Sequence, residues 1–231
     1  MLELFPEGFA EVDGADASEL VAFTDEAGAH QLRARFGDVR VEPVPHGWEN
    51  QWMRFHCPVE LGSLWIGPPW EQPTPGLEPI VIDPGLAFGT GAHPTTQLCI
   101  ELLQALEPAS LLDVGSGSGV LAIAACKLGY EPVVAIDVDE AAVEATRRNA
   151  SANVAAIEAK LFDAGAGTLP ESEITVANID LGTILQLKPP ARCRVLVTSG
   201  YYETDRPEIP EFVHAHRLLR AEWAADLFRR E

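Results

Sequence analysis

Three glycines at alternate positions, Gly115, Gly117 and Gly119, could form a ligand-binding turn. They follow Asp113 and lie between the apolar pair Leu111-Leu112 and a helix-like apolar run that starts at Val120. This order predicts a strand, a tight turn and a helix start. Glycine allows the turn and lets a ligand approach with no Cβ in the way. The first N–H groups of the helix would then face that ligand.

A second predicted strand, Val133–Asp137, ends in a carboxylate. An acid at the end of the strand after a glycine turn can accept hydrogen bonds from both hydroxyls of a ribose. A glycine-rich turn without a ligand is the alternative, but Asp113, the three glycines and Asp137 all occur at the positions that a cofactor-binding turn requires. We therefore expect a cofactor that contains a nucleoside.

The spacing of the glycines separates the cofactor classes. A dinucleotide fingerprint, G-x-G-x-x-G/A, would need Gly or Ala where Val120 stands, and no Gly-Lys-Ser/Thr follows to make a P-loop. The G-x-G-x-G spacing resembles the loop of S-adenosylmethionine methyltransferases. S-adenosylmethionine carries a cationic ammonium and a sulfonium, which suit an acid such as Asp113, whereas a pyrophosphate favours a bare helix N-terminus.

Composition narrows the setting of the protein. The chain has 231 residues, a net charge of −19 and 47% hydrophobic residues, enough for one medium domain, or one with a small companion. No apolar run approaches the roughly 20 residues of a membrane span, and residues 1–6 lack the features of a signal peptide. The four cysteines form no C-x-x-C pair, so we expect a cytoplasmic protein.

The acidic balance bears on partners. Binding of nucleic acid needs clustered Lys and Arg, so we expect no direct contact with it. A net charge of −19 favours a cationic partner such as a basic protein, although the same charge could serve solubility alone. The histidines share no metal-ligand spacing with a carboxylate or cysteine, so no metal site is predicted.

Pattern and proline content divide the chain into a small N-terminal α/β domain (1–58), a linker rich in Pro and Trp (59–82) and an α/β domain (83–231). In the first part we expect strands at Gly8–Val12, Glu19–Phe23 and Val39–Val44 and a helix at Glu26–Phe36. In the last part we expect helices at Pro94–Leu106, Gly119–Leu128 and Glu140–Asn149. Further strands are expected at Ile80–Ile82, Ala159–Phe162, Ile174–Asn178, Arg194–Ser199 and around Leu218 and Leu227. Alternating strands and helices indicate a parallel sheet.

The segment Asp83–Thr96 carries a longer signature. It resembles the ribosomal protein L-eleven methyltransferases (PrmA), whose cofactor loop reads D-P-G-x-A-F-G-T-G-x-H-x-T-T. The match continues through Asp113–Gly119, Ala135–Asp139, Val176–Ile179 and Ser199-Gly200. The resemblance implies a Rossmann-like α/β fold, a seven-stranded sheet with an antiparallel last hairpin. It also implies that S-adenosylmethionine is used to methylate lysine ε-amines and an N-terminal α-amine of a large-subunit ribosomal protein.

The resemblance also assigns residues by position. Thr96 corresponds to a cofactor-contacting threonine, Gly115 to the loop glycine at the methionine part and Asp137 to the ribose acid. Asn178 would lie beside the methyl group, as the catalytic residue. Further cofactor-binding candidates are Phe88 and Thr90, in a loop expected to close over the cofactor, with Asp113, Gly117 and Asp163. Asp163 would hold the adenine amine, or else be an ordinary loop carboxylate.

The reaction explains why an asparagine would stand at the centre. Methyl transfer needs a neutral amine whose lone pair points at the methyl group. The side-chain oxygen of Asn178 and nearby carbonyls can accept the hydrogens of the amine, and orientation of this kind supplies rate. Without the resemblance, Asn178 would be read as a turn residue at a strand end.

Two departures from the family leave alternatives. The family sequence Asn-Ile-Leu-Ala-Gly is here Asn178–Gly182, Asn-Ile-Asp-Leu-Gly. Asp180 would hold or deprotonate a lysine ammonium, or, as we favour, cap the next helix. We expect the N-terminal domain to lack the first strand and helix of the family's recognition domain, either because the domain is reduced or because the sequence begins late. A small-molecule or other-protein N-methyltransferase, or a cofactor-binding module with lost catalysis, therefore stays open. We expect a monomer that does not bind membranes.

Overall fold

The computed structural model describes residues 10–13, 18–21, 26–37, 39–40, 57–83 and 91–231. The chain divides into two compact units, Met1–Asn50 and Gln51–Glu231. The division of the chain at residue 58 stays a prediction. Among the described helices, none is both long and apolar enough to cross a membrane.

The first unit contains a hairpin and a helix. Strands β1 (Ala10–Asp13) and β2 (Ser18–Val21) pair antiparallel and are each shifted by one or two residues from the predicted strands. Helix α1 spans Glu26–Phe36, the predicted range. Of the predicted strand Val39–Val44, residues 39 and 40 are not in a strand and the remainder lies outside the described residues.

The second unit alternates strands and helices. Its strands are β3 (Val59–Leu61), β4 (Leu64–Gly67), β5 (Glu78–Val81), β6 (Leu111–Val114), β7 (Val133–Asp137), β8 (Ile157–Leu161), β9 (Ile174–Asn178), β10 (Val195–Tyr202), β11 (Phe212–Arg220) and β12 (Trp223–Arg230). Its helices are α2 (Pro94–Gln104), α3 (Val120–Lys127), α4 (Glu140–Ala152) and α5 (Leu181–Ile184). The predicted elements from residue 94 onward are all present. α4 runs three residues past its predicted end, and the last two strands are longer than the short runs expected.

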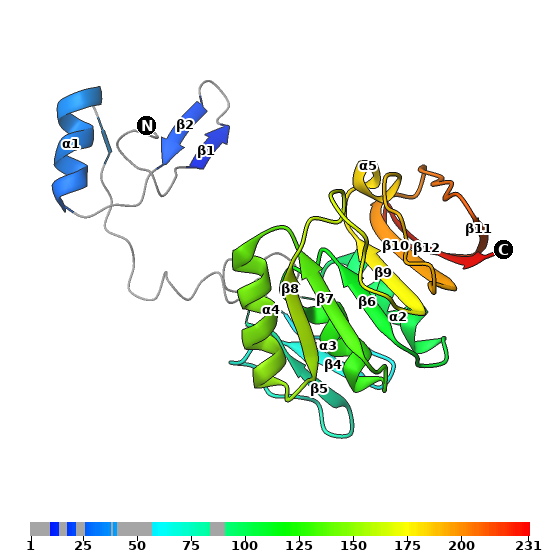
Figure 1. The fold of residues 1–231 in the computed structure, drawn as a ribbon. Helices are drawn as coiled ribbons and strands as arrows, with labels where there is room; N and C mark the ends of the chain where they lie inside the picture. The colour runs from blue at the N-terminus through cyan, green and yellow to red at the C-terminus, as the bar shows by residue number, and fades with distance from the viewer. Residues whose placement is uncertain (1–9, 14–17, 22–25, 38, 41–56, 84–90) are drawn as a thin grey trace. The chain divides into compact units, whose positions relative to one another are not determined.

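The large sheet has the order β11-β12-β10-β9-β6-β7-β8 (Figure 1). The five strands from β10 to β8 are parallel, and β12 runs antiparallel to both of its neighbours. This is the predicted Rossmann-like sheet of seven strands with an antiparallel last hairpin. Chain order reverses between β6 and β9, where open α/β sheets form their ligand crevice.

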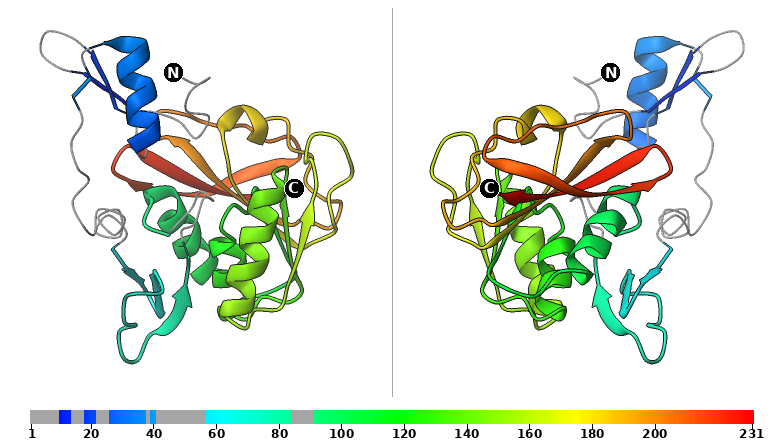
Figure 2. Two further views of the ribbon diagram at one scale, coloured as in Figure 1. Left: turned by 90° about the vertical axis from the view of Figure 1, so that its left-hand side faces the viewer. Right: turned by 90° about the vertical axis from the view of Figure 1, so that its right-hand side faces the viewer.

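The two faces of the sheet carry separate cores because side chains alternate along each strand. Leu111 of β6 joins the core beneath α2, α3 and α4, while its neighbour Leu112 joins the core beneath α5 and the connecting loops. α3 is apolar on nearly all sides and is buried from Val120 to Ala125. Figure 2 shows α2, α3 and α4 lying along one face of the sheet.

Residues 59–82 do not form the extended linker that the prolines suggested. They contain β3, β4 and β5, a three-stranded sheet whose apolar side chains join the core of α2 and α3. Trp65 is among the largest fully buried side chains. Most prolines of this stretch lie in the loop between β4 and β5. Pro79 lies in β5, an edge strand, where a missing N–H is tolerated.

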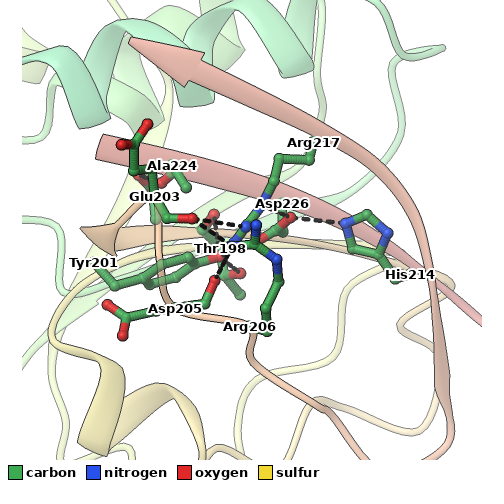
Figure 3. A network of polar contacts seen from close by, with 10 residues as sticks. Thr198, Tyr201, Glu203, Asp205, Arg206, His214, Arg217, Ala224 and Asp226 are labelled. Carbon is green, nitrogen blue, oxygen red and sulfur yellow. Dashed lines mark hydrogen bonds and ion pairs between the residues drawn. The ribbon is translucent and has the colours of Figure 1, made fainter. Parts of the chain in front are cut away.

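A buried polar cluster ties the last three strands together (Figure 3). Asp226 of β12 is 1% exposed and accepts hydrogen bonds from Arg217 Nε at 2.8 Å and from the Tyr201 hydroxyl at 2.8 Å. His214 Nε2 lies 2.7 Å from the same carboxylate. Burial alone would raise the pKa of Asp226, but the hydrogen bonds from Arg217, Tyr201 and His214 outweigh it and lower the pKa.

Beside this cluster, β10 passes very close to the turn after β9. The pairing of β10 with β12 is irregular between Ser199 and Tyr201, and Gly200 has a φ of +104°. A Cβ on Gly200 would lie 2.1 Å from the carbonyl oxygen of Ile179. Only glycine permits this approach, so Gly200 fixes the distance between β10 and the residues that follow β9.

We predict that Asp226→Ala destabilises the protein by about 3–5 kcal/mol at pH 7, because it removes the buried carboxylate that pairs with the partly buried Arg217 and accepts from the buried Tyr201 hydroxyl. A carboxyl group with a lowered folded pKa contributes stability above its unfolded pKa of about 3.9. That contribution is lost as pH falls through the folded pKa, so the difference between the variant and the wild type should shrink in acid. Urea denaturation at several pH values measures both effects.

The control is Glu173→Ala, which removes an exposed ion pair with Arg194. Its cost should be about 0–1 kcal/mol. Equal losses in the two variants would show that the Asp226 cluster is not a structural centre.

We also predict that Gly200→Ala is more damaging than Gly76→Ala. Both glycines have positive φ, but a Cβ on Gly76, at φ +91°, meets nothing within 4 Å. Backbone strain of about 1–2 kcal/mol applies to each variant, and Gly200→Ala adds overpacking of about 1–3 kcal/mol. Thermal unfolding of the two variants tests the difference, and matching losses would exclude the close approach at Ile179.

Candidate functional site

A cavity of about 420 Å³ opens at the carboxyl ends of the central parallel strands. It lies where the strand order reverses, between the loops that follow β6, β7, β8 and β9. The lining residues are Thr96, Val114, Gly115, Ser116, Gly117, Val120, Leu121, Ile136, Asp137, Val138, Phe162, Asp163, Ala164, Gly165, Asn178, Ile179, Asp180 and Thr183. The structure thus brings together Thr96, Gly115, Gly117, Asp137, Asp163 and Asn178 from the sequence prediction.

The glycine loop joins β6 to α3 in a conformation that requires glycine. Gly115, Gly117 and Gly119 have φ values of +76°, +52° and +83°. A Cβ on Gly115 would lie 2.3 Å from Cγ2 of Ile179, so the loop also passes directly against the turn after β9. The loop therefore presents bare backbone to the cavity.

Asp137 ends β7 and holds the loop from the other side. Its Oδ2 accepts from the N–H of Gly117 at 2.9 Å, and its Oδ1 accepts from the N–H of Asp139 at 3.0 Å. A carboxylate has about four lone-pair sites, so these two bonds leave acceptor capacity for hydroxyl donors. Asp137 is thus oriented by backbone before any ligand binds.

Thr96 and Asn178 meet on the opposite wall. Thr96 lies in the first turn of α2, is 1% exposed, and its hydroxyl accepts from Asn178 Nδ2 at 3.3 Å. This bond orients the amide of Asn178, the last residue of β9, and directs its Oδ1 away from Thr96. The side-chain oxygen is then available to accept hydrogens in the cavity.

Asp180 is the N-cap of α5, the reading that we favoured from sequence. Its carboxylate accepts from the N–H of Thr183 at 3.0 Å and from the hydroxyl of Thr183 at 2.6 Å. These hydrogen bonds, with the hydroxyl bond first, lower the pKa of Asp180. The carboxylate therefore stays ionised at neutral pH and is a weak proton acceptor.

Asp163 follows β8 and lines the cavity, with its Oδ1 accepting from the N–H of Gly165 at 2.8 Å. Sequence reasoning missed the apolar lining residues, among them Val138 and Phe162. Val138, which is 72% exposed, and Phe162 each adjoin one of the predicted acids in the chain. An apolar residue next to an acid at a strand end was the available signal for a flat apolar ligand surface.

Asp113 occupies a different place from the one expected. It is fully buried, is not among the lining residues, and accepts from the N–H of Ala122 in α3 at 3.1 Å. Side chains alternate along β6, so Asp113 points to the helix side and Val114 to the other side. The N-cap of α3, Gly119, has no side chain, and Asp113 supplies the acceptor instead.

This burial changes the charge of Asp113. Burial raises the pKa of Asp113 to about 7, the bond from Ala122 lowers it in part, and nearby Asp137 adds to the rise. Its Oδ1 is buried without a hydrogen-bond partner among the described residues. Asp113 therefore shapes the loop, and the carboxylates that face the cavity are those of Asp137, Asp163 and Asp180.

Two predicted cofactor residues, Phe88 and Thr90, lie outside the described residues. His93, after them, caps α2: its Nδ1 lies 2.7 Å from the hydroxyl of Thr95, and Pro94 takes the first helical position. Burial lowers the pKa of His93. No group of His, Cys, Asp and Glu suited to a metal ion occurs among the described residues.

Comparison with known proteins places this geometry in a family. Residues 13–205 match the family described as "Ribosomal protein L11 methyltransferase (PrmA)". A protein of that name from Vibrio campbellii is 40% identical over 178 residues, 70% of this chain and 58% of the relative. One from Photobacterium profundum is 42% identical over 191 residues, 76% of this chain and 65% of the relative.

A solved structure agrees. The crystal structure of a ribosomal protein L11 methylase from Lactobacillus delbrueckii subsp. bulgaricus superposes with a TM-score of 0.68 at 30% identity, covering 75% of this chain and 98% of that one. The chain spans 58% to 65% of the length of these two sequence relatives. The chain thus belongs to the ribosomal protein L11 methyltransferase (PrmA) family.

Proposed function

We propose that this chain is an S-adenosylmethionine-dependent methyltransferase that methylates amino groups of a large-subunit ribosomal protein, at lysine ε-amines, the N-terminal α-amine, or both. The cavity at the strand reversal carries this proposal, since Thr96, Gly115, Asp137 and Asn178 converge there from four separate segments. Family membership supports methyl transfer, and the names of the relatives supply the acceptor.

The cavity fits S-adenosylmethionine better than a phosphate-bearing cofactor. Three carboxylates, Asp137, Asp163 and Asp180, line it, and the lining residues that the structure describes include no Lys, Arg or His. Such a lining favours a cation and disfavours phosphate. Asp137 would accept the ribose hydroxyls, Asp163 the adenine amine, and Val138 and Phe162 would contact the base. The cofactor, when bound, supplies an electrophilic methyl group on a sulfonium.

The acceptor amine must arrive neutral and correctly oriented. Lysine has a solution pKa of about 10.4 and an α-amine one of about 7.7–8.0, so the α-amine is neutral more often at pH 7. Asn178, oriented by its bond to Thr96, would accept an amine hydrogen through Oδ1 and aim the lone pair. No strong base is needed if the site binds the neutral form.

Charge supports a basic acceptor protein. The chain has a net charge of −19, which would steer a cationic partner toward it. The four cysteines all lie among the described residues and form no disulfide there, which suits a reducing cytoplasm. The first unit, Met1–Asn50, would contribute to recognition of the acceptor.

The test is methyl transfer from S-adenosylmethionine to the purified ribosomal protein, followed by intact mass. We expect mass gains in steps of one methyl group. Asn178→Ala should lower the single-turnover rate by about 10²-fold, the cost of a misplaced reacting group. It should change the dissociation constant for S-adenosylhomocysteine, measured by calorimetry, by less than about threefold. This is well under the roughly 1.4 kcal/mol that corresponds to a tenfold change.

Asp163→Asn is the variant to compare with Asn178→Ala, because it changes a proposed cofactor contact and leaves the proposed amine contact in place. It should weaken cofactor binding and leave the single-turnover rate at saturating cofactor near that of the wild type. Cofactor binding without mass gain on the ribosomal protein would contradict the proposed acceptor and favour another amine substrate. A wild-type protein that does not bind S-adenosylhomocysteine would contradict S-adenosylmethionine as the cofactor.

Asp180→Asn separates a cap from an acid–base group. Asn is as good an N-cap as Asp, so we expect little change in melting temperature and a methyl transfer rate within about twofold of the wild type, well below 1.4 kcal/mol in barrier. A rate loss of tenfold or more with unchanged stability would show instead that the carboxylate of Asp180 acts on the amine.

A further inference from the structure

Helix α4 carries a polar stripe on the face that it buries. Thr146, Asn149 and the C-cap residue Asn153 lie at i, i+3 and i+7 and are 0%, 3% and 6% exposed. A helix normally buries apolar side chains on such a face. Burying a polar group costs about 1–3 kcal/mol when it has no hydrogen bond. All three side chains are hydrogen-bonded, and each bonds to backbone outside the helix.

Asn149 is the middle member and joins two distant segments. Its Nδ2 donates to the carbonyl oxygen of Ser118, inside the glycine loop, at 2.9 Å. Its Oδ1 accepts from the N–H of Asp83, the first residue of the Asp83–Thr96 signature, at 3.2 Å. One amide therefore sets the distance between the cofactor loop and the point where the signature segment begins.

The other two residues of the stripe bond to backbone outside the bridge between Ser118 and Asp83. Asn153 accepts from the N–H of Val81 at 2.8 Å and donates to its carbonyl oxygen at 2.7 Å, as a strand partner would for β5. Asn153 also donates to the carbonyl oxygen of Asn149 at 2.8 Å. On the other side, the hydroxyl of Thr146 donates to the carbonyl oxygen of Gly117 at 3.1 Å.

We propose that Asn149 is a positioning residue for the cofactor. By bridging Ser118 and Asp83 it holds the glycine loop and the start of the signature segment in the register that the cofactor needs. This inference rests on the proposed function, because it concerns the affinity of the same site for S-adenosylmethionine. Asn149 itself is not among the residues that line the cavity, so it acts through the backbone that it holds.

The experiment compares Asn149→Ala and Asn149→Leu with Asn153→Ala in the full chain. Asn149→Ala removes both bridging bonds, and Asn149→Leu does so while filling the volume. Asn153→Ala removes the bonds to β5 and spares the bridge, so it serves as the matched control for lost stability. Calorimetry with S-adenosylhomocysteine gives the dissociation constant, and thermal unfolding without ligand gives the stability of each variant.

We expect both Asn149 variants to raise the dissociation constant at least tenfold, and Asn153→Ala to raise it less than threefold at a similar loss of melting temperature. Amide exchange at Asp83 should also accelerate in the Asn149 variants without ligand. Dissociation constants that simply follow melting temperature across all three variants would overturn the proposal. A wild-type protein that does not bind S-adenosylhomocysteine would instead contradict the proposed function.

Discussion

The site depends on the close passage of Ile179 between two glycines. A Cβ on Gly115 would meet its side chain at 2.3 Å, and a Cβ on Gly200 would meet its carbonyl oxygen at 2.1 Å. The turns after β6 and β9 and the irregular part of β10 can therefore approach one another. Asn178 precedes Ile179, so this contact also decides where its amide stands relative to the glycine loop.

Buried polar groups hold the segments around this contact in place. Asp113 accepts a hydrogen bond from the first turn of α3, behind the glycine loop, and Asp226 joins the last three strands beside Gly200. The stripe on α4 fixes the far side of the loop through Asn149. Each of these groups is hydrogen-bonded to other elements, so the backbone that faces the cavity is set by tertiary contacts rather than by local turn preference.

The environment gives four acids different roles. Burial raises the pKa of Asp113 to about 7, and this residue accepts a hydrogen bond at the start of α3. Hydrogen bonds lower the pKa of Asp180, which caps α5 and faces the cavity. The carboxylates of Asp137 and Asp163 accept hydrogen bonds from backbone N–H groups and also face the cavity. The resulting lining is suited to a cationic ligand, in keeping with a family of methyltransferases.

The sequence determined the order of elements from Pro94 onward, because helical and strand periodicity and glycine turns are local properties. Asp137 was indicated by its place at the end of a strand after a glycine turn, whereas Thr96 and Asn178 were indicated only by the resemblance to the PrmA family. Sequence reasoning misassigned residues 59–82, where proline content outweighed the short apolar strands, and placed Asp113 in the cavity. Only the tertiary structure could decide these points and reveal Asn149, since burial depends on how distant elements pack. The bonds from Asn149 to Ser118 and from Asn153 to Val81 join residues 31 and 72 positions apart.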